Sequence, residues 1–138
     1  MLGTARVGSL TGQIVAVSLI KRLSATGMTD ATVLAGANLG SDGLLGGTGS
    51  AMDSFAAGTI DRLDVSGAIH SSFIGAGEHP VDGIFGNGND TEAGAGVIKS
   101  ISAATADDTT RFESSAFGIA KLPKKVINLT ADPRFIIL

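Results

Sequence analysis

The sequence predicts an all-β protein built as a parallel β-solenoid (β-helix), in which short strands stack coil upon coil. Three observations favour this fold: the chain repeats itself at an offset of 40, apolar and polar residues alternate within each copy, and glycines occur where corners would lie. No segment has the capped helical periodicity of a long helix. A length of 138 residues fits one domain, residues 1–138.

The repeat is gapless between its first two copies. The stretch "IKRLSATGMTDATVLAGANLGSDGLLG", from Ile20, matches "IDRLDVSGAIHSSFIGAGEHPVDGIFG", from Ile60, at an offset of 40. A shorter third copy begins near Ile98 at an offset of 38 and loses register after Thr105. The predicted units cover about residues 20–59, 60–97 and 98–120. We expect each unit to make about two coils, and the chain to be a fragment of a larger repeat protein.

Alternation along each strand places one set of aliphatic side chains inside. Equivalent residues of stacked coils should lie ~4.8 Å apart or a small multiple of that distance. At the offset of 40, Val33 falls on Phe73. The predicted inward rows are Ile20, Ile60 and Ile98, and Leu23, Leu63 and Ile101. The main alternative is an antiparallel β-sandwich, which also uses short, evenly spaced strands but does not explain gapless repetition.

The C-terminal segment, about residues 109–138, has the bulkiest apolar side chains, including Phe112, Phe117 and Phe135. The open edges of a sheet must be covered or paired to prevent fibre growth. We therefore interpret this segment as a cap, with a subunit interface as the alternative.

One glycine-rich loop, "VDGIFGNGNDT" at residues 81–91, suggests a metal site. Calcium prefers six to eight oxygen ligands in a flexible loop. The candidate ligands are Asp82, Asn87, Asn89 and Asp90. The spacing is not that of an EF-hand and is closer to the glycine-rich turns of calcium-binding β-helix repeats. The alternative is a turn that needs no metal, since Asn-Gly and Asp-Gly are common turn dipeptides.

The first copy provides an internal comparison for this loop. It keeps an aspartate at Asp42 but has Gly47, Gly49 and Ser50 where the second copy has the later candidate ligands. Calcium is therefore expected, if at all, in the second copy. The apolar pairs Leu44–Leu45 and Ile84–Phe85 suggest that each loop tucks against the strands.

These loops and the strands after them, "GTIDRLDVSG" and "GVIKSISAAT", resemble the repeats of large bacterial cell-surface and adhesin-like β-helix proteins. In that family a strand ending in "AG" is followed by a loop of the type "DGxxGxxDDT" and then by a "GxIxxIxVxG" coil. The resemblance covers roughly residues 20–120 and implies an extracellular or cell-surface structural or adhesive protein. The second aspartate of the family loop is Asn89 here.

Composition excludes several other classes of function. A net charge of −3 with dispersed basic residues gives no footprint for nucleic acid or for an anionic membrane. The longest apolar run is too short to insert into a membrane as a helix. With no cysteine, the chain has no disulfide or zinc-thiolate site.

An enzyme is the less favoured class. The repeat offsets align Asp30, His70 and Asp108, so a polysaccharide-acting β-helix enzyme could use His70 as a general base oriented by Asp30. Polar residues at an outward turn also occur without any catalytic role. We therefore predict a non-enzymatic structural or adhesive module, with surface polysaccharide or self-association into a homo-oligomer or fibre as the partners to test.

Overall fold

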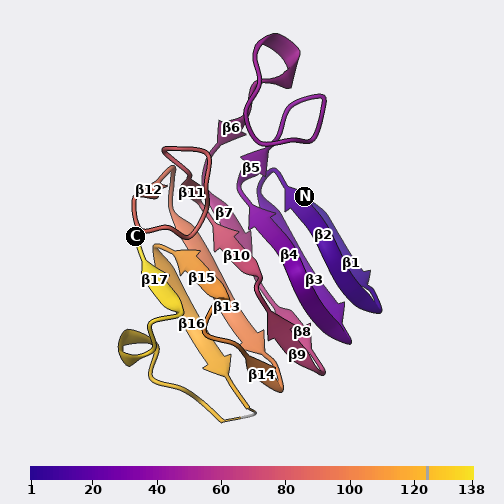
Figure 1. Ribbon diagram of the computed structural model, residues 1–138, viewed down its shortest axis with the longest axis vertical. Helices are drawn as coiled ribbons and strands as arrows, with labels where there is room; N and C mark the ends of the chain where they lie inside the picture. The colour runs from indigo at the N-terminus through magenta and orange to yellow at the C-terminus, as the bar shows by residue number, and fades with distance from the viewer. Residues whose placement is uncertain (124) are drawn as a thin grey trace.

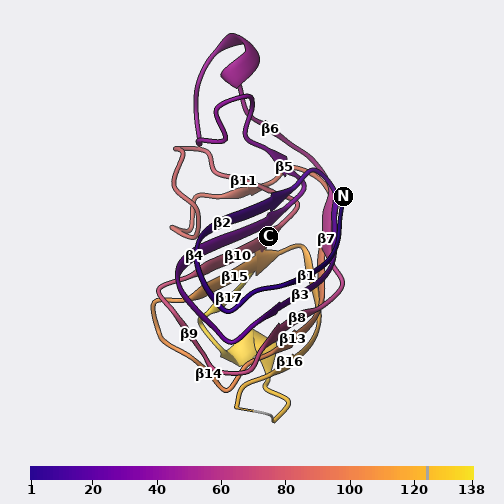
Figure 2. The same ribbon diagram turned by 90° about the vertical axis from the view of Figure 1, so that its right-hand side faces the viewer.

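Alternating apolar and polar residues form short strands in this chain, and glycine-containing corners separate them. The computed structural model describes residues 1–123 and 125–138. These residues form an all-β protein whose helical elements are two short 3-10 turns, η1 (Gly49–Ala51) and η2 (Leu129–Ala131). Figure 1 shows the strands running side by side, and Figure 2 shows two sheets with the chain passing from one to the other.

Two parallel sheets contain most of the strands. The first comprises β1 (Leu2–Arg6), β3 (Leu19–Ala25), β7 (Gly58–Ile60), β8 (Leu63–Val65), β13 (Gly96–Ser102) and β16 (Ala116–Lys121). The second comprises β2 (Ser9–Ala16), β4 (Gly27–Ala35), β9 (Ala68–His70), β10 (Phe73–Ala76), β14 (Thr105–Ala106), β15 (Arg111–Ser114) and β17 (Phe135–Ile137). The remaining strands form two small antiparallel pairs, β5 (Ala37–Asn38) with β6 (Ser54–Phe55) and β11 (Glu78–His79) with β12 (Thr91–Glu92).

The chain alternates between the two large sheets. We call one run of the chain through the first sheet and then through the second a passage. Each passage adds one strand, or two short ones, to each of the two sheets. The neighbouring strands named in these two sheets pair in parallel, as in β3 with β7 and β4 with β10. The antiparallel sandwich considered as the alternative is therefore wrong, because it requires antiparallel pairing within both sheets.

The predicted inward rows lie in the core between the sheets. Ile20 pairs with Ile60, and Ile60 pairs with Ile98, as the offsets of 40 and 38 predicted. The same register joins the second row, and the side chains of both rows are at most 2% exposed. The main hydrophobic cluster contains both rows, so this part of the core prediction is confirmed.

The expectation of two coils per unit is wrong. Ile20 and Ile60 are direct partners on adjacent strands, so one repeat unit advances each sheet by a single passage. A passage without an inserted loop is about half as long as the unit, since Leu2 pairs with Ile20 and Val97 pairs with Ala116. The rest of the unit is a loop, 36–57 in one copy and 77–95 in the next, that leaves the sheets and returns.

The register in the second sheet differs by one residue from the prediction. Val33 pairs with Ile74, not with Phe73, because the second copy has one extra residue at the corner after Val65. A shift of one residue exchanges the two faces of a strand. Val33 and Ile74 consequently both point into the core with 0% exposure, and Phe73 points outward.

The third copy continues further than expected. Instead of losing register after Thr105, it resumes pairing in β15, where Ile74 lies opposite Phe112. Residues 109–138, interpreted as a cap, supply the last strands of the two sheets, β16 and β17. Phe112 and Phe135 stack at a centroid distance of 4.6 Å, so the core continues to the end of the described chain.

Candidate functional site

The loop between β10 and β13, residues 77–95, contains the four candidate calcium ligands. Asp82 organises its tip: the amide of Ile84 donates to its Oδ1 at 3.0 Å, and the side-chain amides of Asn87 and Asn89 each donate to its Oδ2 at 2.9 Å. The hydrogen bond from Asn89, followed by that from Ile84, holds the pKa of Asp82 below its usual value. The loop tip is thus closed by its own polar groups.

Asp90 faces a different set of partners. Its Oδ2 accepts the amide of Gly86 at 2.6 Å, and its carboxyl lies against Glu113 of β15. The structure therefore brings three of the predicted ligands, Asp82, Asn87 and Asn89, together. It turns the fourth, Asp90, toward the sheet. Among residues 1–123 and 125–138, no three His, Asp or Glu side chains are grouped so that they could hold a metal ion. The shape of the loop does not require a metal.

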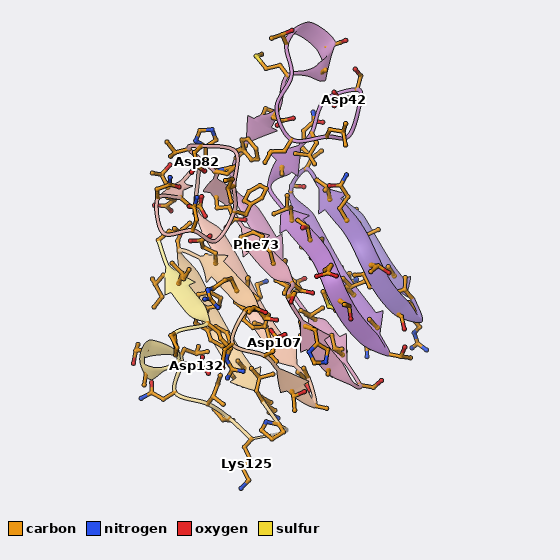
Figure 3. All side chains as sticks on the ribbon, in the orientation of Figure 1. Asp42, Phe73, Asp82, Asp107, Lys125 and Asp132 are labelled. Atoms are coloured by element: carbon orange, nitrogen blue, oxygen red, sulfur yellow. The ribbon has the colours of Figure 1, made fainter. Side chains whose placement is uncertain are left out.

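The loop of the first copy uses the same scheme. Leu44 donates to Asp42 at 3.0 Å, and Gly46 donates to Asp53 at 2.5 Å. Asp53 thus accepts a loop glycine amide in the first copy, as Asp90 does in the second. The expectation that the first copy has lost this carboxylate is wrong, because the aspartate lies slightly later in the chain than the aligned position, Ser50. Figure 3 shows Asp42 and Asp82 in the two loops, with Asp107 apart from both.

The predicted packing of the apolar pairs holds for Phe85 of the second pair, and Leu45 of the first pair is half-buried. Phe85 stacks on Phe73 of β10 at a centroid distance of 5.0 Å and also contacts Phe55 edge-on. Ile84 is 60% exposed and Leu44 is 64% exposed, so these two residues do not pack as expected. An aromatic contact therefore fastens the second loop over the outer face of the second sheet.

Beneath this loop lies a cluster of three carboxyl groups, which we call the carboxyl cluster: Glu78, Asp90 and Glu113. Glu113 is 0% exposed and Glu78 is 3% exposed, although both are acidic. Glu113 lies opposite Gly75 of β10, and the Glu78 carboxylate occupies the space above Gly75 that any larger side chain would fill. The missing side chain at Gly75 makes room for the cluster.

The environment of the cluster opposes negative charge. Burial, then the charge of Glu113, raises the pKa of Glu78 from 4.5 to about 10. Burial and the neighbouring Asp90 raise the pKa of Glu113 to about 7. None of the four carboxylate oxygens of Glu78 and Glu113 has a hydrogen-bond partner. The backbone amide of Gly86 donates to Asp90 at 2.6 Å, and it lowers the pKa of Glu113 by less than burial and Asp90 raise it. A proton on one of the two glutamates removes this conflict, because a carboxylic acid donates to its neighbour.

Sequence reasoning did not identify Glu78 or Glu113. "GAGEHP" and "RFESS" look like ordinary polar turns and strand edges. The offset of 38 carried through β15 would have placed Glu113 beside Gly75, whose partner on its other side is Leu34. The loss of register predicted after Thr105 concealed that placement.

The catalytic alternative is not assembled as predicted. His70 lies opposite Thr29, not Asp30, because of the extra corner residue. Its Nδ1 lies 3.3 Å from Oδ2 of Asp107, which was not among the predicted residues. Asp108 instead offers its backbone carbonyl to Arg111 at 2.5 Å. Asp30, His70 and Asp108 therefore do not form a ladder of paired side chains.

Comparisons with known proteins give no relative: no family model, no curated protein and no solved structure matches the chain. Within the part of the chain that the structure describes, no helix is long and apolar enough to cross a membrane.

Proposed function

We propose that this chain is a non-enzymatic structural module, a β-solenoid of a bacterial surface or secreted protein, which acts as a spacer and displays its loops. One observation carries the proposal: the residues of successive passages pair in register across the molecule. Leu19, Thr59, Val97 and Ala116 form one such row. A regular stack of this kind sets a fixed length per unit, which is the property a spacer needs.

The loops add the second part of the proposal. Figure 1 shows the loops 36–57 and 77–95 leaving the strands at the same end. Other passages connect the two sheets without a long loop, so these loops of about 20 residues are not needed to connect the strands. Long loops of this kind are typical of functional loops on a rigid scaffold. Leu44 and Met52 of the first loop are 64% and 65% exposed, so this loop presents apolar side chains for adhesion. The resemblance of these repeats to bacterial surface proteins supports the same role.

The proposal is tested by lengthening the chain. One, two or four extra copies of residues 60–97 are inserted after Val97, where the pairing of Ile60 with Ile98 sets the register. We expect each copy to fold and to lengthen the particle by about 4.8 Å, one strand spacing. Small-angle X-ray scattering measures the maximum dimension, and circular dichroism measures the strand content.

The matched control inserts a scrambled copy of the same composition, which should disrupt folding. Intact copies that expand the chain as a flexible tail, without added strand signal, would contradict the spacer proposal.

A further inference from the structure

The loop 77–95 is fastened to the second sheet over groups that titrate. We propose that this loop is a proton-dependent latch: it lies closed on the sheet while Glu78 and Glu113 hold protons, and it opens when they ionise. The inference concerns a regulatory property and is independent of the spacer role.

Two features support the inference: the carboxyls of Glu78 and Glu113 are buried, and their oxygens have no hydrogen-bond partner. Closing the loop removes Glu78 and Glu113 from water almost completely. Moving an ionised carboxylate out of water without a cation or a donor is strongly unfavourable, whereas a protonated carboxyl costs far less. Two acids that face each other in this way keep a proton instead of both ionising. The closed loop therefore depends on protons.

The surrounding charged groups do not neutralise the cluster. β10 carries no ionisable side chain. On β15, the guanidinium of Arg111 donates to the carbonyls of Asp108 and Thr110. The other ionisable groups of the loop are engaged elsewhere: the His79 ring packs on Phe55, Glu92 accepts from Ser115, and Asp82 holds the loop tip. None of the ion pairs formed by the described residues involves a member of the cluster.

Opening can be confined to residues beyond the base of the loop, where Glu78 itself lies in β11 and pairs with β12. The amide of Gly77 donates to the carbonyl of Ala35, and that of Ala93 donates to Gly77, so the base of the loop is tied by backbone hydrogen bonds. Phe85 on Phe73 is the main apolar contact of the tip. Ionisation of the cluster consequently opposes this contact, and the backbone pairing of the parallel sheets is unaffected.

The direction of the pH effect follows from the proton balance. In the closed loop the pKa of Glu78 is about 10 and that of Glu113 about 7, against the ordinary value of 4.5 expected when the loop is open. The closed form therefore binds more protons than the open form as soon as the pH exceeds about 4.5. Closure is favoured fully below that pH and weakens as the pH rises through about 7 and toward 10.

Hydrogen exchange of the wild-type protein in a chelator, measured from pH 5 to pH 9 and corrected for intrinsic rates, tests the latch. At a given pH, some carboxyls of the cluster are protonated when the loop is closed and ionised when it is open. We expect the opening equilibrium constant of residues 77–95 to rise by about tenfold per pH unit for each such carboxyl. Residues 36–57, the loop of the preceding unit, serve as the internal control. They have no buried glutamate and should show no such rise.

Two variants sharpen the test. Glu78→Gln with Glu113→Gln replaces both acids by neutral groups that keep a donor, and should abolish the pH dependence. Glu92→Gln changes an exposed carboxylate of the same loop and should leave the dependence intact.

One measurement does not depend on the variants. Infrared spectroscopy of the wild-type protein should show the carbonyl band of a protonated carboxylic acid at pH 7. Its absence would overturn the proposal, as would loop exchange that is independent of pH. Exchange that responds to added calcium and not to pH would also overturn it, in favour of a metal site.

Discussion

Leu63 shows at the scale of one residue how the fold is stabilised. Its side chain is 0% exposed and lies between Leu23 on one neighbouring strand and Ile101 on the other. Close packing of aliphatic residues in register means that the neighbours fill only part of the cavity left when one of them is shortened. Each residue of such a row therefore supports two neighbours at once.

We expect Leu63→Ala to lower the free energy of unfolding by about 2–5 kcal/mol, because it removes buried methyl groups and leaves a cavity. Leu44→Ala, at a site that is 64% exposed, is the matched control and should change it by less than about 0.5 kcal/mol. Urea denaturation measures both. Equal effects of the two substitutions would show that the aliphatic row is not the core.

Single residues also show what the sequence could and could not predict. The inward rows were predictable because repetition and alternation agree at every member. The carboxyl cluster was not, because an acidic residue looks the same in sequence whether it is buried or exposed. Only the register of β15 against β10 reveals that Glu113 lies beside Gly75 beneath a loop.

At the scale of elements, the turn from Asp107 to Thr110 is held by one carboxylate. Asp107 accepts hydrogen bonds from the amides of Ser71, Thr109 and Thr110 and from both threonine hydroxyls. Its partial burial acts to raise its pKa, but the hydrogen bonds from Thr110, Thr109 and Ser71 outweigh this and hold the pKa well below 3.8. The ionised form of Asp107 is therefore what stabilises the connection between β14 and β15.

A folded-state pKa below 3.8 means that Asp107 contributes stability above that pH and loses it as the pH falls further. We expect Asp107→Asn to lower the melting temperature at pH 6 and to flatten the acid limb of the stability curve. The exposed neighbour provides the control, Asp108→Asn, which should change neither. Calorimetry from pH 2 to pH 6 measures the curves. An unchanged acid limb in the Asp107 variant would contradict the assignment.

At the scale of elements, the prediction of two coils per repeat unit was wrong, because each unit contains one passage and a long loop. The repeat offset of 40 is close to twice the sequence separation of the paired residues Val97 and Ala116, so two coils and one coil with a loop fit the length equally well. Glycine-rich composition does not separate the two, because corners and projecting loops both use glycine. The pairing of Ile20 with Ile60 decides for the loop.

Considered as a whole, the molecule is two parallel sheets around one hydrophobic cluster, with the loops 36–57 and 77–95 at one end of the strands. The all-β class and the parallel arrangement follow from the repeat itself, since gapless repetition brings equivalent residues side by side. The one-residue insertion at the corner after Val65 was not visible in a gapless alignment. That insertion moved both Phe73 and His70 away from their predicted partners.

The central claim is that each repeat unit advances the stack by one strand, and an engineered crosslink tests it most directly. The chain has no cysteine, so Thr59→Cys with Val97→Cys creates a single possible disulfide between directly paired residues. Adjacent strands lie ~4.8 Å apart, within the range of Cα separations that a disulfide spans, and residues two strands apart lie beyond it. Leu19→Cys with Val97→Cys is the control pair, because Thr59 lies between these positions. We predict rapid intramolecular oxidation of the first pair and none of the second. Failure of the first pair to oxidise in the folded protein would contradict the claim, because two coils per unit would place Thr59 and Val97 two strands apart.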